Sequence, residues 1–222
     1  MRRLLKDAYL VTKSLQRSAA KNGVGFYWDI ADSDNLASLV NRLSNPNNRE
    51  RQVIREVLHR ENPHTLLDAG CGVATELVSY RIGEIKVDYV GLDKSSYMLS
   101  KARKWHQEAK FVRGEVEALP FSDDSFDAVV LRHILEHLGD YKTAVKEALR
   151  VSSKVVIIDF FHRLLPLGLG WKIWDKDGYW NNWYSKTEFV RFLQSLDVPY
   201  KVITTKGNSG QTAEVYILEK RK

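Results

Sequence analysis

Apolar residues in the first sixty positions recur mostly at helical spacing, whereas those after residue 63 gather into short runs. The predicted N-terminal helices cover residues 1–20, 31–43 and 49–60. In the third of these, one stripe of the helix carries Val53, Ile54, Val57 and Leu58. A stripe of this spacing is typical of an amphipathic helix. We therefore predict an N-terminal helical cap or arm over residues 1–62.

From residue 63 onward, apolar runs alternate with segments of helical period. The runs that predict strands span 65–70, 88–93, 110–115, 126–131 and 154–160. The segments that predict helices span 74–83, 95–105, 140–151 and 185–196. Two further strands, 200–206 and 213–220, are separated by a turn rich in Gly, Asn and Ser and predict an antiparallel hairpin. Alternating strands and helices predict βαβ units. The expected fold class is α/β, a seven-stranded mostly parallel sheet with one antiparallel edge strand and helices on both faces, over residues 63–222.

Charge and cysteine content narrow the function classes. The formal net charge of +6 is concentrated at the two ends, with +5 over residues 1–21 and +3 over residues 220–222, which leaves about −2 for the rest. A body that is not basic disfavours a broad phosphate-binding face. Cys71 is the only cysteine, so no intramolecular disulfide can form and no zinc cluster built on several cysteines is present. Neither a signal peptide nor an apolar run of membrane-spanning length is evident, so we expect a cytoplasmic protein.

The first predicted strand leads into 66-LLDAGCGVAT-75, which carries candidate chemistry. Gly70 and Gly72 allow a sharp turn and a close backbone approach to a ligand. Thr75 replaces the third glycine of a dinucleotide fingerprint, and no G-K-[ST] follows, which excludes a P-loop. Asp68 places an acid where a phosphate cradle would not favour one. A cationic or amino-bearing ligand suits this turn better.

Four segments, taken together, resemble the class I S-adenosylmethionine-dependent methyltransferases of the small-molecule type often called type 11. They are 68-DAGCG-72, 90-VGLD-93, 113-RGEVEALPF-121 and 125-SFDAVV-130, in the order and spacing of that family. The resemblance covers roughly residues 60–160. It implies a Rossmann-like fold, S-adenosyl-L-methionine as the cofactor, and methyl transfer as the activity.

The resemblance also implies a cofactor-binding set. Asp93 would hold the ribose hydroxyls, Glu115 would accept from the adenine amino group, and Val116 and Met98 would contact the ring. The full set is Asp68, Ala69, Gly70, Gly72, Asp93, Lys94, Met98, Glu115, Val116 and Arg132. Ala74 and Glu115 depart from the family, which most often has Gly and Asp at these positions. Two alternatives stay open: Asp93 as a helix cap and Met98 as plain core.

The stretch 131-LRHILEHL-138 contains H-x-x-E-H, the letters of an inverted zinc-peptidase signature. That chemistry needs both histidines on one face of a helix, but His133 directly follows a predicted strand. By the resemblance, this segment leaves the fourth strand where methyl donor and acceptor meet. His133 and His137 are therefore the candidate catalytic residues, as base or acceptor-positioning groups. A divalent ion at Glu136 and His137 and a purely structural role are the alternatives; no metal is included in the predicted site.

An aromatic-rich insertion over residues 161–184 is expected to form a lid. It carries Trp171, Trp174, Trp180 and Trp183 together with Asn181 and Asn182. Aromatic faces and amides of this kind suit a ring-shaped acceptor, with Tyr27 and Trp28 as lid partners. A self-packed cap is one alternative, and peripheral membrane contact through 164-LLPLGLGWKIW-174 is another.

The sequence thus predicts an S-adenosylmethionine-dependent methyltransferase that acts by O- or N-methylation on a small-molecule or glycan-type acceptor. The partner would be a sugar, an aromatic or a lipid-linked molecule rather than nucleic acid. Two alternatives remain: an RNA methyltransferase that uses the basic N-terminal arm, and a module that binds the cofactor without catalysis.

Overall fold

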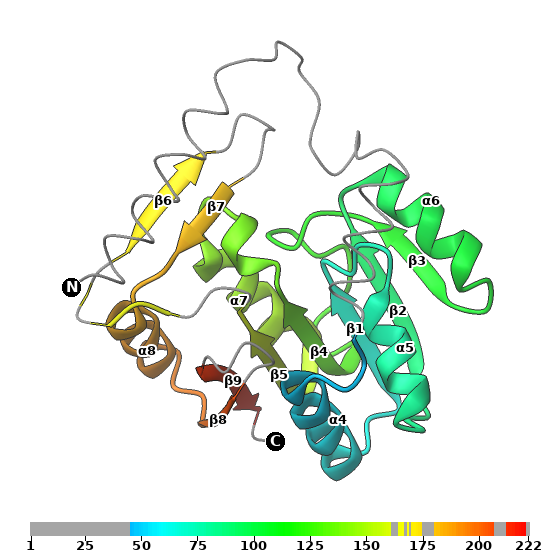
Figure 1. Cartoon of the computed structure of the whole chain (residues 1–222), viewed down its shortest axis with the longest axis horizontal. Helices are drawn as coiled ribbons and strands as arrows, with labels where there is room; N and C mark the ends of the chain where they lie inside the picture. Colours follow the sequence, from blue (N-terminus) through cyan, green and yellow to red (C-terminus); the bar gives the residue numbers. More distant parts are fainter. Residues whose placement is uncertain are drawn as a thin grey trace.

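Seven strands form a single sheet in the order β3-β2-β1-β4-β5-β9-β8 (Figure 1). The computed structural model describes residues 45–160, 164–166, 168, 170–174, 180–206 and 212–220, and the helices predicted before residue 45 lie outside these ranges. The strands are β1 Thr65–Ala69, β2 Asp88–Asp93, β3 Lys110–Arg113, β4 Phe126–Arg132, β5 Ser152–Asp159, β8 Tyr200–Lys206 and β9 Thr212–Glu219. The first five are parallel to one another, and β9 runs antiparallel to both β5 and β8.

This arrangement confirms the predicted seven-stranded, mostly parallel α/β fold. It also refines one detail, because the antiparallel strand β9 lies between β5 and β8 and is therefore one position in from the edge. The helices are α4 Arg49–Glu61, α5 Thr75–Ile82, α6 Ser96–Trp105, α7 Tyr141–Val151 and α8 Lys186–Ser195. Ser185 caps the start of α8, because its hydroxyl accepts a hydrogen bond from the backbone N–H of Glu188 (3.2 Å).

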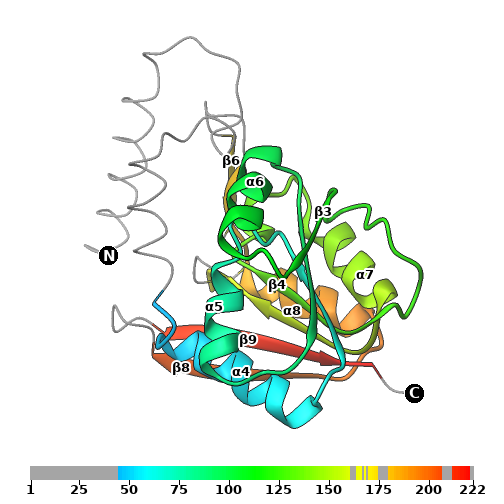
Figure 2. The same cartoon turned by 90° about the vertical axis from the view of Figure 1, so that its right-hand side faces the viewer.

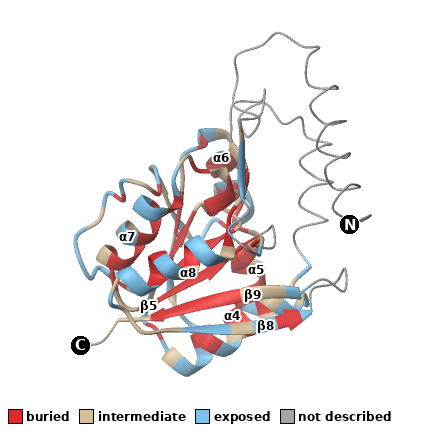
Figure 3. Cartoon of the chain, turned by 90° about the vertical axis from the view of Figure 1, so that its left-hand side faces the viewer, coloured by how far each residue is buried: buried red, intermediate tan, exposed pale blue. Residues whose placement is uncertain are grey.

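The two faces of the sheet bury alternate residues of the same strands. Ala128 and Val130 of β4 pack with the helices α4 and α5, whereas Val129 and Leu131 pack with α7 and α8. Successive side chains of a strand point to opposite faces, so a strand covered on both sides reads as a continuous apolar run. Figure 2 shows the helices on either side of the sheet, and Figure 3 shows the buried residues along β5 and β9.

Helix α4 falls within the range predicted for the N-terminal cap, but its apolar stripe shares the core of the sheet. Val53, Ile54, Val57 and Leu58 are all buried and pack with β4, β5 and β9. The boundary at residue 62 itself stays a prediction. The described start of the chain is therefore anchored on the same face as α5.

A two-stranded antiparallel hairpin was not predicted as such. β6 Trp171–Trp174 pairs with β7 Trp180–Trp183 inside the segment expected to form a lid. This hairpin is separate from the main sheet. Single tryptophans, lysines and asparagines in this stretch gave no clear alternation of apolar and polar residues, which explains why it was missed.

An aromatic cluster holds α7 and α8 against β5 and β9. Phe189 is fully buried, and its ring centroid lies 5.3 Å from that of Tyr141 and 5.0 Å from those of Phe160 and Tyr216. These edge-on contacts are worth more than area burial alone. Phe189 is therefore the centre of this layer.

We predict that Phe189→Ala lowers the free energy of unfolding by about 3–5 kcal/mol, because it leaves a cavity between three rings. Urea denaturation followed by circular dichroism measures this loss. The matched control is Val202→Ala on β8, where the side chain is 38% exposed and a change of about 0.5 kcal/mol is expected. A loss of less than 1 kcal/mol for Phe189→Ala would contradict the packing described here.

Candidate active site

The turn after β1 is held in a conformation that favours glycine. Gly70 and Gly72 have φ angles of +86° and +54°. The N–H groups of Gly70 and Cys71 donate to the carbonyl oxygen of Leu92 at 2.7 and 2.9 Å. A Cβ at Gly70 would lie 2.5 Å from Cγ1 of Ile134, whereas one at Gly72 would meet nothing within 4 Å. The turn is thus pressed against the exit of β4 on one side and has open space beside Gly72, which fits a bound ligand.

Asp93 ends β2 next to this turn, as the sequence predicted. Its carboxylate accepts hydrogen bonds from the N–H of Gly72 (2.8 Å) and from the N–H of Ser95 (2.9 Å). The N-cap of α6 is Ser95, whose hydroxyl accepts from the N–H of Met98. Asp93 is therefore not the helix cap, and its half-buried carboxylate is fixed beside the glycine turn.

Asp68 lies inside the sheet under the turn. It is 2% exposed, and the hydroxyl of Tyr89 donates to its Oδ2 at 2.8 Å. Burial, together with the nearby carboxylate of Glu76, raises the pKa of Asp68 to about 7, and Arg132 opposes the rise. The carboxyl group of Asp68, at the base of the candidate site, therefore changes its protonation state near neutral pH.

The remaining residues predicted to bind the cofactor lie around the turn in two groups. Ala69, Met98 and Val116 are buried, and Met98 packs against Val73 of the turn. Lys94 and Glu115 are exposed, and their backbone carbonyls accept from Nε of Arg113 and the N–H of Ala118. A buried apolar wall beside exposed polar groups is compatible with a bound purine ring, and these individual roles stay predictions.

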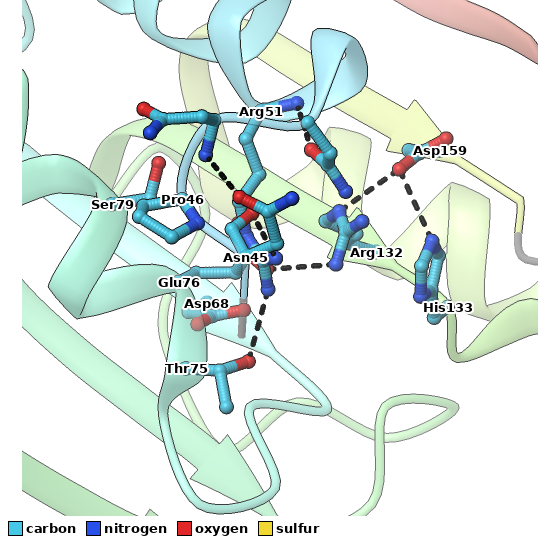
Figure 4. Close-up of polar contacts among 12 residues, drawn as sticks. Asn45, Pro46, Arg51, Asp68, Thr75, Glu76, Ser79, Arg132, His133 and Asp159 are labelled. Atoms are coloured by element: carbon cyan, nitrogen blue, oxygen red, sulfur yellow. Dashed lines mark hydrogen bonds and ion pairs between the residues drawn. The ribbon is translucent and has the colours of Figure 1, made fainter. Parts of the chain in front are cut away.

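A buried network of charges joins four elements behind the turn (Figure 4). Arg51 of α4 binds both carboxylate oxygens of Glu76 on α5, with its closest contact at 2.6 Å. Arg132 at the end of β4 donates to Glu76 at 2.8 Å and forms an ion pair with Asp159 of β5 at 2.9 Å. Two arginines and two carboxylates compensate each other, which buried charges require.

His133 lies at the open end of this network. Its backbone has a φ of +54°, its N–H donates to the carbonyl of Asp159 (2.9 Å), and its Nε2 is 3.3 Å from Asp159 Oδ2. The imidazole keeps 21% of its surface exposed, whereas the other side chains of the network keep at most 7%. Burial and Arg132 lower the pKa of His133, and Asp159 opposes them. The net result is an imidazole that favours the neutral form.

The H-x-x-E-H segment does not form an α-helix. β4 ends at Arg132, and Leu135–His137 make a short 3₁₀ turn. In the part of the chain that the structure describes, no group of three His, Cys, Asp or Glu residues is arranged to hold a metal ion. The helix on which a peptidase site depends is therefore missing, and Glu136, which lies within the 3₁₀ turn, is buried.

The β6–β7 hairpin docks on this 3₁₀ turn. Nδ1 of His137 lies 2.9 Å from the carbonyl oxygen of Trp180, and Asn182 donates to the carbonyl of Leu138 at 2.7 Å. The Tyr184 hydroxyl, just after β7, contacts the carbonyls of Leu135 and Leu138 at 3.1 and 2.9 Å. His137 is thus tied to the hairpin, while His133 is tied to the charge network, and the two candidate catalytic histidines have different surroundings.

Three members of the charge network were not among the predicted site residues: Arg51, Glu76 and Asp159. Asp159 carried a usable signal, because it ends the apolar run 154–159 at the carboxyl edge of the sheet, where ligands of open α/β sheets bind. Arg51 and Glu76 lie 25 residues apart in two amphipathic helices. Nothing in their local sequence indicated that they meet.

We predict that Arg51→Ala lowers the free energy of unfolding by about 3–5 kcal/mol, because it removes one partner of the buried Glu76 charge. Arg49→Ala on the same helix is the control, since its side chain is 48% exposed and its ion pair with Glu56 is worth at most about 1 kcal/mol. Chemical denaturation of both variants measures the difference. Equal effects would show that the Arg51–Glu76 pair is not a buried interaction of this kind.

We predict that Asp68 destabilises the folded chain as pH rises. The pKa of Asp68 is raised from 3.8 to about 7 in the folded state, so the folded chain holds this proton more tightly than the unfolded chain does. The free energy of unfolding therefore falls as the pH rises from about 4 to about 7. Asp68→Asn mimics the protonated acid, so the stability of the variant relative to the wild type should rise by about 2–3 kcal/mol from pH 5 to pH 8. Urea midpoints at both pH values measure this, with the exposed Asp88→Asn as control. A relative stability that does not change with pH would contradict the raised pKa.

Comparison with known proteins finds a family model that matches part of the chain. Residues 67–157 match the family model described as "Methyltransferase domain". Among curated relatives, the demethylmenaquinone methyltransferase of Paenarthrobacter aurescens is 29% identical over 174 residues, covering 77% of this chain and 60% of the relative. That of Renibacterium salmoninarum is 32% identical over 117 residues, covering 51% and 48%. The chain therefore spans about half the length of the curated relatives it matches.

Solved structures share the fold. The YcgJ protein of Bacillus subtilis superposes with a TM-score of 0.62 at 18% identity, covering 78% of this chain and 98% of that one. The 1,6-didemethyltoxoflavin-N1-methyltransferase of Burkholderia thailandensis, solved with 1,6-didemethyltoxoflavin and S-adenosylhomocysteine, superposes with a TM-score of 0.61 at 18% identity, covering 86% and 87%. These comparisons confirm the resemblance stated from the sequence, and the predicted enzyme class and cofactor agree with them.

Proposed function

We propose that this chain, whose residues 67–157 match the methyltransferase family model, is a class I S-adenosylmethionine-dependent methyltransferase that transfers a methyl group from S-adenosylmethionine to a small ring-shaped acceptor. The observation that carries the donor half of this proposal is the pairing of Asp93 with the glycine turn. The carboxylate is fixed by the N–H of Gly72, and Gly72 itself faces open space. Carboxylate oxygens can accept from a vicinal diol, which suits the ribose of the donor.

The donor would contribute a methyl group already activated on a sulfonium sulfur. Around it, Asp93 would hold the ribose, the buried Met98 and Val116 would cover the adenine, and the acid Asp68 would favour the positive end of the donor. Because the methyl group is already activated, the remaining task of the protein is to position the two reactants and exclude water. The buried turn and the charge network behind it provide a rigid wall for this purpose.

A ring-shaped acceptor is supported by the hairpin that borders the site. Trp171 and Trp183 lie across from each other on β6 and β7, with ring centroids 6.1 Å apart, and Trp171 is 39% exposed. The hairpin docks on the 3₁₀ turn that follows His133. Two relatives carry names that refer to flat ring systems, demethylmenaquinone and 1,6-didemethyltoxoflavin. An aromatic or quinol-type acceptor therefore fits better than a glycan.

The membrane-contact interpretation has no support from a spanning segment, since none of the helices in the described part of the chain is long and apolar enough to cross a bilayer. A lipid-linked ring acceptor would not need one. Peripheral contact through the exposed Trp171 remains compatible with the proposal.

We predict that S-adenosylhomocysteine binds the chain and that Asp93→Ala weakens binding at least tenfold, because two hydrogen bonds to the ribose are lost. Isothermal titration calorimetry measures both affinities. The control is Asp88→Asn, at the exposed start of the same strand β2, which should bind like the wild type. Unchanged affinity for Asp93→Ala would reject the assigned donor site.

The acceptor is tested by donor consumption in the presence of separate pools: reduced quinols and phenols, sugars, lipid-linked rings and RNA. Turnover with the quinol and phenol pool is the expected result. Turnover with RNA alone would favour the RNA methyltransferase alternative. Donor binding with no turnover in any pool would favour a non-catalytic binding module.

A further inference from the structure

Asp159 is a buried carboxylate that contacts His133 in addition to its ion-pair partner Arg132. It lies at the carboxyl end of β5 and is 2% exposed. One of its oxygens contacts both Arg132, the last residue of β4, and His133, the residue after it. Oδ2 is 2.9 Å from Arg132 Nε and 3.3 Å from His133 Nε2. The backbone of Asp159 also accepts the N–H of His133. Asp159 therefore contacts both the main chain and the side chain of His133.

We propose that Asp159 is a positioning residue that fixes His133 as a proton acceptor for the methylated substrate, which must then carry an acidic proton such as that of a quinol or phenol hydroxyl. This inference rests on the proposed methyltransferase function and deepens it. A carboxylate can only accept, so the 3.3 Å contact between Asp159 Oδ2 and His133 Nε2 favours the tautomer that carries its proton on Nε2. The lone pair of the neutral ring is then on Nδ1, the atom that can take a proton.

The charged groups around His133 favour this state. Arg132 precedes it on β4, Asp159 faces it from β5, Glu76 faces it from α5, and Arg51 from α4 compensates Glu76. The two arginines balance the two carboxylates, so a further positive charge on the imidazole is not compensated. Burial adds to this cost, and the pKa of His133 is lowered. A ring that is neutral before the reaction is what a base needs.

The location of His133 is also suited to the task. The following residue, Ile134, packs against Gly70 of the donor turn so closely that a Cβ at Gly70 would clash with it. Beyond Ile134, the 3₁₀ turn carries the aromatic hairpin. His133 therefore directly precedes the residue that contacts the glycine turn and lies just before the 3₁₀ turn that holds the hairpin, and 21% of its side chain is exposed.

The proton balance of the proposed step is simple. The acceptor loses one proton to Nδ1 of His133 and gains one methyl group, and the positive charge of the sulfonium is replaced by the released proton, which leaves from the imidazole to solvent. No oxidant or reductant is required. An acceptor amine that is already neutral would not need this base, so the inference separates acidic hydroxyl acceptors from amines.

The test uses nitrogen-15 NMR of the histidine rings, which reports the tautomer and the pKa without any acceptor. His133→Gln assigns the signal by its disappearance. In the wild-type chain we expect His133 with its proton on Nε2 and with a pKa below the ordinary value. In Asp159→Asn we expect the preference for Nε2–H to be lost and the pKa to fall further, because the carboxylate that raised it is gone. The ring of His64, exposed near the opposite edge of the sheet, should not change in either respect.

A wild-type His133 with its proton on Nδ1 would overturn the inference, as would an unchanged tautomer in Asp159→Asn. If that variant does not fold, the wild-type tautomer alone still decides. Calorimetry of the wild type with S-adenosylhomocysteine distinguishes failure of the proposed function from failure of the positioning role of Asp159. Absence of binding by the wild type would reject the proposed function and leave the tautomer result standing.

Discussion

The paired charges of Arg132 with Glu76 and Asp159 are the constraint on which the site depends. An arginine buried at the end of a central strand needs carboxylates within contact distance, because an uncompensated charge in the interior costs several kcal/mol. Glu76 and Asp159 meet this need from α5 and β5, and Arg51 supplies the second positive charge from α4. These pairs fix the helix after the glycine turn relative to the strands that carry His133 and Asp159. The glycine turn and His133, the candidate base, are therefore both supported by these ion pairs.

The strands of the fold could be predicted from short apolar runs, since a strand buried on both faces has no polar side to interrupt it. The glycine turn was also predictable, because Gly70, Gly72 and Asp93 carry their signal in local sequence and the topology of neighbouring parallel strands brings them together. What was predicted for residues 1–44 lies outside the described residues. The individual roles of Glu115 and Lys94 stay predictions.

The charge network could not be predicted, because its members come from four elements and meet only through the tertiary fold. Arg51 and Glu76 look like polar residues of amphipathic helices, yet both are buried. The hairpin of β6 and β7 was missed for a different reason. Its stability depends on docking to the 3₁₀ turn through Asn182 and Tyr184, which is a tertiary contact rather than a local preference. The H-x-x-E-H segment could likewise be interpreted only once its position after β4, in a 3₁₀ turn rather than an α-helix, was known.

In the proposed site, the methyl donor binds at the carboxyl edge of the sheet, beside Gly72 and Asp93. Titration of S-adenosylhomocysteine into nitrogen-15-labelled protein, followed by amide NMR, tests this directly. We expect saturable shifts of the amides of Gly72 and Ser95, whose N–H groups donate to the Asp93 carboxylate. We expect no shifts of the amides of Thr65 and Asp88 at the opposite edge. Absence of saturable shifts, or shifts confined to the opposite edge, would contradict the proposed site.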